Sequence, residues 1–309
     1  MAVCRHLGIL SGVLLFVFGL IACEQSGGST SVLPLPDTKI KQALASHDFS
    51  VSETGLTPVV DIDSEELSIL MVGNSYLSYQ PLLNGEKSHY SVARQFIDMT
   101  RKVIPGVTHR IHSIGGGTLQ EHWERGESEG TPRFDLMHGQ FDVMVIQGRY
   151  DILEKTKFND RFDRYANLFA ELAARHNVKV VFYGLWATDT QISSSGGDRF
   201  GPAANEIYCK AAVRHQAACA PNGMAYGLVY KTLASVSEDA TLEEMLTDDF
   251  IHPSPPVAYM AANVVYSTIF AQEPLPLSIY QPPGTSDELG QLMRAAAWSA
   301  TNAHGISGN

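Results

Sequence analysis

The sequence lacks the features of several large classes of protein. Lysine and arginine are scarce, with 22 against 33 aspartates and glutamates in 309 residues, which leaves a formal net charge of −11. Nucleic-acid-binding proteins carry basic surfaces, so we expect no nucleic-acid partner. The metal-ligand spacings CxxC and HExxH do not occur, and we expect no metal site. The hydrophobic share of 44% is ordinary for a globular protein, which excludes disorder as the main state.

Long apolar runs are also scarce, and the one that concerns a membrane lies at the start of the chain. Arg5 precedes an apolar segment that ends in the letters LIAC, at Cys23. Residues 1–22 are therefore predicted to be a secretory signal peptide. The ending resembles a bacterial lipobox, which implies that Cys23 is lipidated and anchors the chain in the cell envelope, with Glu24 favouring the outer membrane. A transmembrane anchor and an ordinary signal peptide with a chance cysteine are the alternatives.

Only two cysteines, Cys209 and Cys219, are left for the folded part of the chain. On one straight helix, ten residues would separate them by about 15 Å, which is too far for a disulfide. A bridge therefore requires that a helix ends between them. The sequence favours a disulfide between these two cysteines and a pair of free thiols equally.

The rest of the chain is expected to form one catalytic-size domain, residues 66–309, behind a flexible tether at 23–37 and an N-terminal extension at 38–65. Short β-branched apolar runs predict buried parallel strands at 67–72, 108–114, 142–146, 178–183 and 218–221. Amphipathic stretches predict helices near 86–103, 158–176, 203–217, 256–271 and 287–303. This alternation predicts an α/β protein, a three-layer α/β/α sandwich with a mainly parallel five-stranded sheet.

Ligands bind beyond the carboxyl ends of strands in such sheets, and three candidate residues follow predicted strands there. Ser75 in the segment GNS would lie at a helix N-terminus, where N–H groups face a developing negative charge. Gly116, in a glycine triplet, would let backbone amides approach a ligand, and Gln147 carries a side-chain donor. Taken singly, each residue also fits an ordinary structural role. Ser75 fits a helix cap, Gly116 a flexible turn, and Gln147 a side chain that binds neighbouring loops.

A fourth candidate segment stands near the C-terminus. Asp249 and His252 are three residues apart, so on a helical turn they share a face, and the carboxylate can orient the imidazole. Asp248 competes for this role at a spacing of four. Alone, Asp-x-x-His is common and mostly structural.

Together, the four segments resemble the SGNH hydrolase superfamily, or GDSL-like esterases, over residues 66–275, in a bacterial branch with a GNS first block. The resemblance implies a flavodoxin-like fold and a catalytic triad of Ser75, His252 and Asp249. It also implies an oxyanion hole from the backbone amides of Ser75 and Gly116, with Gln147 as a third donor. Such an enzyme needs no metal or organic cofactor.

Two departures from the family pattern bear on the substrate. Asn74 stands where the first block usually has Asp, and Gln147 stands where the third block has Asn. The segment from Gln147 to Asp151 resembles a variant found in carbohydrate acetylesterases, which implies a small acyl ester or an acylated glycan as substrate. The competing hypothesis is an inactive lipoprotein of the same fold that binds glycans or assists assembly.

Two further features fit either a role in the substrate site or a purely structural role. His122 and Trp123 follow the glycine triplet, where they could line the substrate pocket, although packing is the commoner role of an aromatic residue. The Gly/Ser-rich segment 191–202 follows the fourth predicted strand and is expected either to shape the site or to be a plain surface loop.

Overall fold

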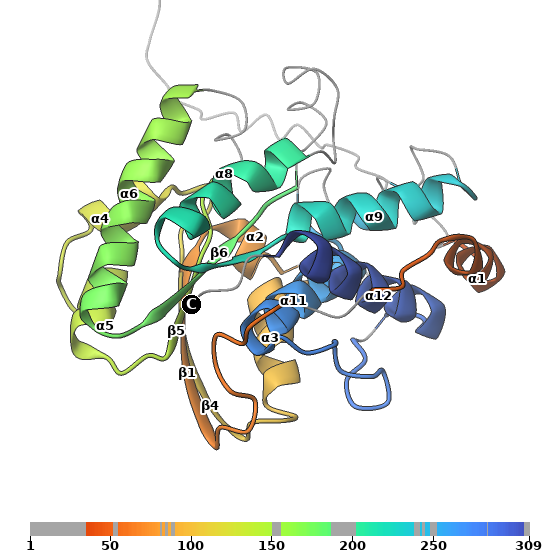
Figure 1. Ribbon diagram of the computed structural model, residues 1–309, viewed down its shortest axis with the longest axis horizontal. Helices are drawn as coiled ribbons and strands as arrows, with labels where there is room; N and C mark the ends of the chain where they lie inside the picture. The colour runs from red at the N-terminus through yellow and green to blue at the C-terminus, as the bar shows by residue number, and fades with distance from the viewer. Residues whose placement is uncertain are drawn as a thin grey trace, which may run out of the picture. The chain divides into compact units, whose positions relative to one another are not determined.

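Five strands form one sheet, and every neighbouring pair in it is parallel. In the order β4-β1-β5-β6-β7 they span Gly106–Ser113, Glu66–Gly73, Val143–Ile146, Lys179–Tyr183 and Ala218–Ala220 (Figure 1). The predicted α/β class and five-stranded parallel sheet are therefore confirmed. The computed structural model describes residues 35–51, 55–80, 82–83, 86–87, 90–149, 156–186, 202–237, 242, 245–247, 252–282 and 284–305.

The strand order fixes where a site can form. The chain passes from β1 outward to β4 and then crosses to β5 on the other side of β1, so the connections leave in opposite directions between β1 and β5. This reversal is the switch point at which open α/β sheets bind ligands. Gly73 closes β1 opposite Ser113 of β4, and Gln147 follows the last residue of β5. The chain segments that carry Ser75 and Gln147 therefore leave the sheet at the same point.

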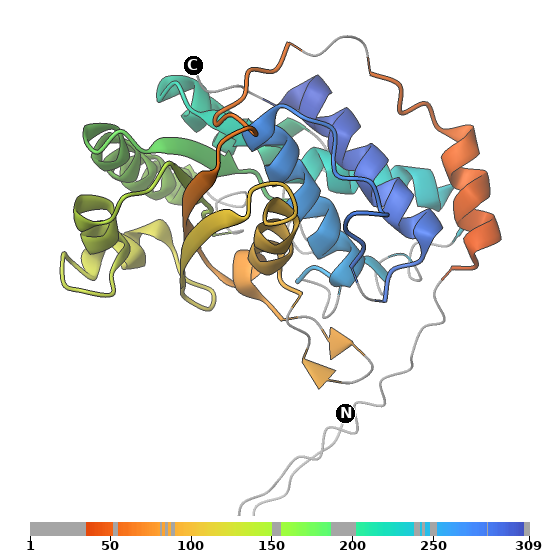
Figure 2. The ribbon, with the colours of Figure 1, turned by 90° about the horizontal axis from the view of Figure 1, so that it is seen from below.

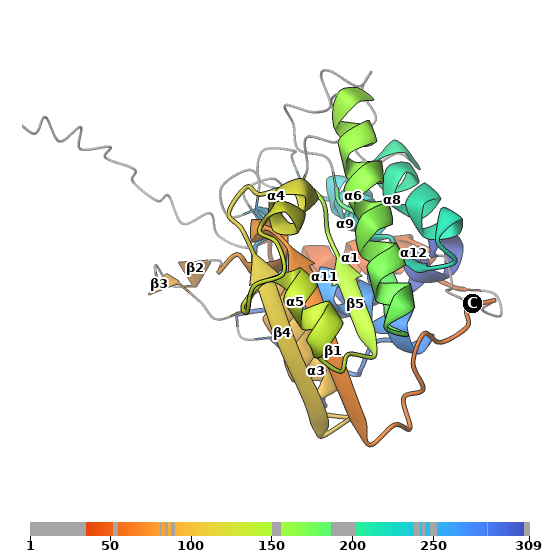
Figure 3. The same ribbon diagram turned by 90° about the vertical axis from the view of Figure 1, so that its left-hand side faces the viewer.

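Helices cover both faces of the sheet. One face is covered by α3 (Val92–Thr100) and α11 (Pro255–Phe270), with α9 (Asn222–Ala234) and α12 (Asp287–His304) packed on α11. The other face carries α4 (Leu119–Glu124), α5 (Pro132–His138), α6 (Thr156–Arg175) and α8 (Pro202–Arg214). Figure 2 shows the strands between these two groups, and Figure 3 shows α4, α5 and α6 in front of the sheet.

The central helix α11 is buried on all sides. Every side chain from Pro256 to Phe270 is inaccessible or nearly so. A helix that is apolar all round belongs in a core, and α11 lies between the sheet, α3 and α12. It begins three residues after His252, so the core helix holds the chain that carries this histidine.

Several boundaries differ from those predicted. The helix expected from residue 86 begins at Val92, because Ser91 caps it and residues 82–83 and 86–87 pair instead as β2 (Leu82–Leu83) and β3 (Glu86–Lys87). The tether was expected to continue to residue 37, but Leu35 is buried and α1 (Asp37–Ser46) begins at Asp37. α1 packs on α12 and α9, so this part of the N-terminal extension belongs to the folded unit.

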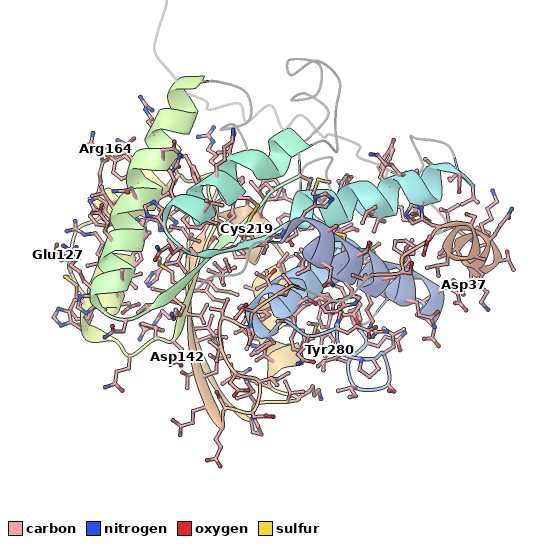
Figure 4. The ribbon with its side chains drawn as sticks, viewed as in Figure 1. Asp37, Glu127, Asp142, Arg164, Cys219 and Tyr280 are labelled. Carbon is pink, nitrogen blue, oxygen red and sulfur yellow. A yellow bond between two sulfur atoms is a disulfide. The ribbon has the colours of Figure 1, made fainter. Side chains whose placement is uncertain are left out.

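Cys209 and Cys219 form a disulfide, with their Cα atoms 5.2 Å apart. Helix α8 ends at Arg214 and β7 begins at Ala218, so a helix end lies between them, as the bridge requires. Figure 4 shows Cys219 where α8 and β7 meet. The signal segment and Cys23 lie outside the described residues. Among the helices that are described, none is long and apolar enough to cross a membrane.

Candidate active site

The turn after β1 presents Ser75 at the start of a one-turn helix, α2 (Ser75–Ser78). Asn74 caps this helix, because its Oδ1 accepts a hydrogen bond of 3.1 Å from the Tyr76 amide. Asn and Ser are preferred caps because their side chains reach the free amides of the first turn. Ser75 is half-buried, so its hydroxyl stays accessible at the carboxyl edge of the sheet.

His252 lies within hydrogen-bond distance of this serine, although 177 residues separate them in the sequence. The distance from its Nε2 to Ser75 Oγ is 2.8 Å. The imidazole is stacked on the ring of Tyr79, with centroids 4.1 Å apart and planes within 6° of each other. Behind it, Pro253 forms a β-bridge with Thr247. The pair has the separation that a nucleophile and its general base require.

Asn74 joins three loops beneath Ser75. Its Nδ2 donates to the carbonyl oxygens of Gly117, at 3.1 Å, and Gly148, at 3.4 Å, and its own amide donates to Gln147 Oε1 at 2.9 Å. The side chain is almost fully buried. Asp has no donor to offer these two carbonyls, which gives a physical reason for Asn at a position where the resemblance leads us to expect Asp.

The amide group of Gln147 is engaged at both ends. Its Oε1 accepts from Asn74, and its Nε2 donates to the carbonyl of Gly148. A Cβ at Gly73 would lie 2.6 Å from Gln147 Oε1, so only glycine permits this close approach. The buried geometry favours a role for Gln147 in holding the serine turn over the oxyanion-donor role that the resemblance implies.

The glycine loop after β4 is fixed at both ends. At one end, the Ile114 amide donates to the Gly73 carbonyl at 3.2 Å, beside the serine turn. At the other, Thr118 and Glu121 form a capping box that starts α4. Gly116 between them is exposed and has a φ of +62°, a conformation that favours glycine. No hydrogen bond within the described residues uses the amide of Ser75 or Gly116.

His122 points into the protein, beneath the serine turn. Its Nε2 lies 2.6 Å from the Gly73 carbonyl oxygen, and the side chain is 1% exposed. Burial lowers the pKa of His122 to about 4, so the imidazole is neutral near pH 7. Trp123 turns the other way, edge-on to Phe169 and beneath the guanidinium of Arg133. Trp123 therefore packs, and His122 contacts the backbone of the site itself.

Several residues proposed from the sequence lie outside the described residues. They are Asp248, Asp249, Asp151 and segment 191–201. Tyr79 was not singled out from the sequence, although its position four residues after Ser75 puts it one helical turn away. Within the described ranges, no cluster of His, Cys, Asp or Glu has the arrangement of a metal site.

A cavity of about 560 Å³ opens beside this region. It is lined by Gln80, Tyr90, Ser91, Arg94 and Asp98. Gln80 directly follows Tyr79, and the Gln95 amide ties this end of α3 to the start of α11 by donating to the Pro255 carbonyl at 3.1 Å. The cavity is therefore close in the chain to the ring that covers His252. Its charged residues form an ion pair, with Arg94 Nε 2.9 Å from Asp98 Oδ2.

Solved structures share this arrangement of strands and helices. A DUF4886 family protein from Bacteroides uniformis has a TM-score of 0.54 at 14% identity, covering 76% of this chain and 94% of that one. A provisionally assigned SGNH hydrolase from Slackia heliotrinireducens has a TM-score of 0.49 at 22% identity, covering 66% and 99%. A lipase/acylhydrolase from Enterococcus faecalis has 0.46 at 13%, covering 64% and 93%. No family model and no curated protein matches the sequence.

Proposed function

We propose that this chain, which has the fold of the SGNH hydrolases, is a serine esterase that removes small acyl groups from carboxylic esters. The observation that carries the proposal is the 2.8 Å contact between Ser75 Oγ and His252 Nε2. The contact lies at the switch point of the sheet, where ligands bind in this architecture. A fold alone does not fix an activity, so the proposal rests on the pair and not on the likeness to hydrolases.

The reaction begins with attack of Ser75 on the ester carbonyl. His252 accepts the Ser75 proton as Oγ bonds to the carbonyl carbon, and then gives it to the leaving alcohol. Water hydrolyses the acyl-serine by the same steps, with His252 again as the base. We assign Asp249 the orientation of His252, on the three-residue spacing in the sequence.

Two backbone amides stabilise the charge that develops on the ester oxygen. The amides of Ser75 and Gly116 serve as the donors, because they belong to the two loops that meet at Gly73 and neither is used by a hydrogen bond within the described residues. A single donor of this kind is worth about 10²–10³ in rate in other enzymes. Gln147 supports the hole by holding Asn74, which ties the two loops together.

Acetylated carbohydrates are the substrates we favour. The segment from Gln147 to Asp151 resembles a carbohydrate acetylesterase variant. The cavity near Tyr79 is lined by neutral polar side chains and by one positive and one negative side chain. A neutral, hydroxyl-rich leaving group suits such a lining, because it can both donate and accept hydrogen bonds. We further propose that lipid on Cys23 holds the enzyme in the bacterial envelope, and Cys23→Ser should abolish incorporation of labelled palmitate.

The test is hydrolysis of p-nitrophenyl acetate by residues 24–309, with labelling of the same protein by a serine-directed fluorophosphonate. Ser75→Ala should remove both signals while the melting temperature changes by less than about 3 °C, since a half-buried hydroxyl contributes little to stability. Ser78→Ala is the matched control, because Ser78 lies in the same short helix and contacts Ser113 instead. Full activity in Ser75→Ala would refute the proposal. Inactivity of the unaltered chain towards ester and probe would favour the glycan-binding alternative.

A further inference from the structure

A buried histidine that the reaction does not use holds the backbone from which Ser75 projects. His122 lies in α4, and its Nε2 contacts the Gly73 carbonyl oxygen at 2.6 Å. Its other nitrogen, Nδ1, is also buried and meets no hydrogen-bond partner among the described residues. The ring thus directs a single nitrogen to a single carbonyl, that of Gly73.

The identity of the acceptor fixes the protonation of the ring. A carbonyl oxygen only accepts, so Nε2 carries the proton and Nδ1 is bare. A second proton on Nδ1 would place a charge in the interior, near His112 of β4 and Arg125, which both oppose it, and near Glu121, which favours it. Burial outweighs both the hydrogen bond to the Gly73 carbonyl, which also favours the charged ring, and Glu121, so the imidazole is a neutral donor near pH 7.

The carbonyl that His122 contacts belongs to the peptide group that joins β1 to the serine turn. The oxygen of this group, on Gly73, receives hydrogen bonds from His122 and from the Ile114 amide. Its N–H, on Asn74, donates to Gln147 Oε1. Side chains from α4 and from the loop after β5 thus hold opposite edges of one peptide plane. Rotation of the plane would break hydrogen bonds at both edges, and its orientation sets the direction in which Ser75 leaves the strand.

We propose that His122 is a positioning residue of the esterase, which clamps the Gly73–Asn74 peptide together with Gln147 and so holds Ser75 Oγ in line with His252. The inference rests on the proposed function for its catalytic consequence. His122 contacts neither the substrate nor the reacting atoms, and it acts only through the backbone. Loss of the donor therefore lowers the rate of attack by Ser75 and leaves substrate binding nearly unchanged.

Two variants of the full chain separate the donor from the volume of the side chain. His122→Met fills the space without an N–H, and His122→Gln keeps a side-chain N–H near the position of Nε2. We expect His122→Met to lower kcat for p-nitrophenyl acetate by about 10- to 100-fold with KM within about threefold, and His122→Gln to recover most of the loss. The control is His109→Met, in the middle of β4 opposite Ile69, which should match the unaltered chain.

The kinetic outcomes decide between positioning and packing. An unchanged kcat in His122→Met overturns the inference. Equal losses in both His122 variants that track the fraction of folded protein, measured by circular dichroism, also overturn it, since packing alone then explains the effect. A kcat that stays high in His122→Gln and falls in His122→Met supports the donor role, because the two side chains occupy similar volumes.

A second measurement keeps the inference testable if the esterase proposal fails. In the unaltered chain, ¹⁵N NMR should show the Nε2–H tautomer of His122. Hydrogen exchange of the Asn74 amide should be slow, and it should become at least about tenfold faster in His122→Met but not in His122→Gln. The Nδ1–H tautomer, or slow exchange in both variants, would overturn the clamp. Absence of hydrolysis and labelling in the unaltered chain would instead refute the esterase and leave the clamp to be judged by these spectra.

Discussion

The two sides of the candidate active site are held in different ways. The Ser75 side rests on a buried network in which Asn74, Gln147 and His122 bind backbone groups of neighbouring loops. The His252 side presents a half-buried ring, stacked on Tyr79 and carried by the turn before α11. Polar networks in the interior fix geometry strongly and are costly to break. We call the side of the proposed nucleophile, Ser75, the rigid side, and the side of the proposed base, His252, the stacked side.

The largest effect should come from the stacked side, and on activity alone. His252→Ala removes the proposed general base, and we expect kcat for p-nitrophenyl acetate to fall by at least about 10³-fold. The free energy of unfolding should change by less than about 1 kcal/mol, because the side chain is only half-buried. Steady-state kinetics and urea unfolding measure the two quantities. A large loss of stability would show that both sides are structural and would remove the contrast.

Asn74→Asp should, by contrast, reduce stability and activity together. The carboxylate cannot donate to the Gly117 and Gly148 carbonyls, and it would face both oxygens in a buried site. We expect a loss of about 2–4 kcal/mol in the free energy of unfolding, with a lower kcat in the protein that stays folded. Asn263→Asp is the matched control, since Asn263 is fully buried in α11 and donates to the Tyr259 carbonyl at 2.9 Å. The control should lose stability and keep the kcat of its folded fraction, and an equal fall in both would contradict a special role for Asn74.

His122 gives the rigid side a pH dependence of its own. Its pKa is about 4 in the folded chain against 6.5 as its ordinary value, so between these values only the unfolded chain binds the proton. The free energy of unfolding is therefore unaffected by this titration above pH 6.5. It falls as the pH falls towards 4, and His122 changes it no further below pH 4. The loss should reach roughly 2–3 kcal/mol by pH 4.5.

Urea unfolding at pH 7.0 and 4.5 measures this loss, with His122→Gln as the reference that lacks the titration. The unaltered chain should lose more stability on acidification than the variant does, whatever the other groups contribute to both. If the two proteins lose the same amount, the imidazole titrates alike in the folded and unfolded chains, and the buried neutral donor is excluded.

The contrast between the two sides also explains what the sequence could predict. The five strands were predicted to within two residues at each end, because buried parallel strands are unbroken apolar runs with clear boundaries. Helix α9 was missed because it packs on α8, α11, α12 and α1, so it has no polar face to give it helical periodicity. Ser75 and His252 were singled out by motif, and the fold brings them together.

The supporting residues were not predictable in the same way. Asn74, Gln147 and His122 act on carbonyls and amides of loops that are distant in sequence, and no local pattern reveals which backbone group a buried side chain will meet. His122 was noted from the sequence only as a pocket-lining or packing candidate. A buried donor becomes recognisable only once the register of β1 with β4 places the glycine loop beside Gly73.

The smallest effect should come from Tyr79. Its ring lies parallel to the imidazole of His252, so the negative face of the ring would stabilise the imidazolium that the proposed attack of Ser75 forms. Tyr79→Leu should lower kcat about three- to tenfold and change KM little, whereas Tyr79→Phe, which keeps the ring, should stay within about twofold. The free energy of unfolding should fall by less than about 1 kcal/mol in either variant. Equal kcat values in the two variants would assign the stacking no catalytic part. A loss confined to Tyr79→Leu would show that ring contact supports the stacked side, as buried hydrogen bonds support the rigid side.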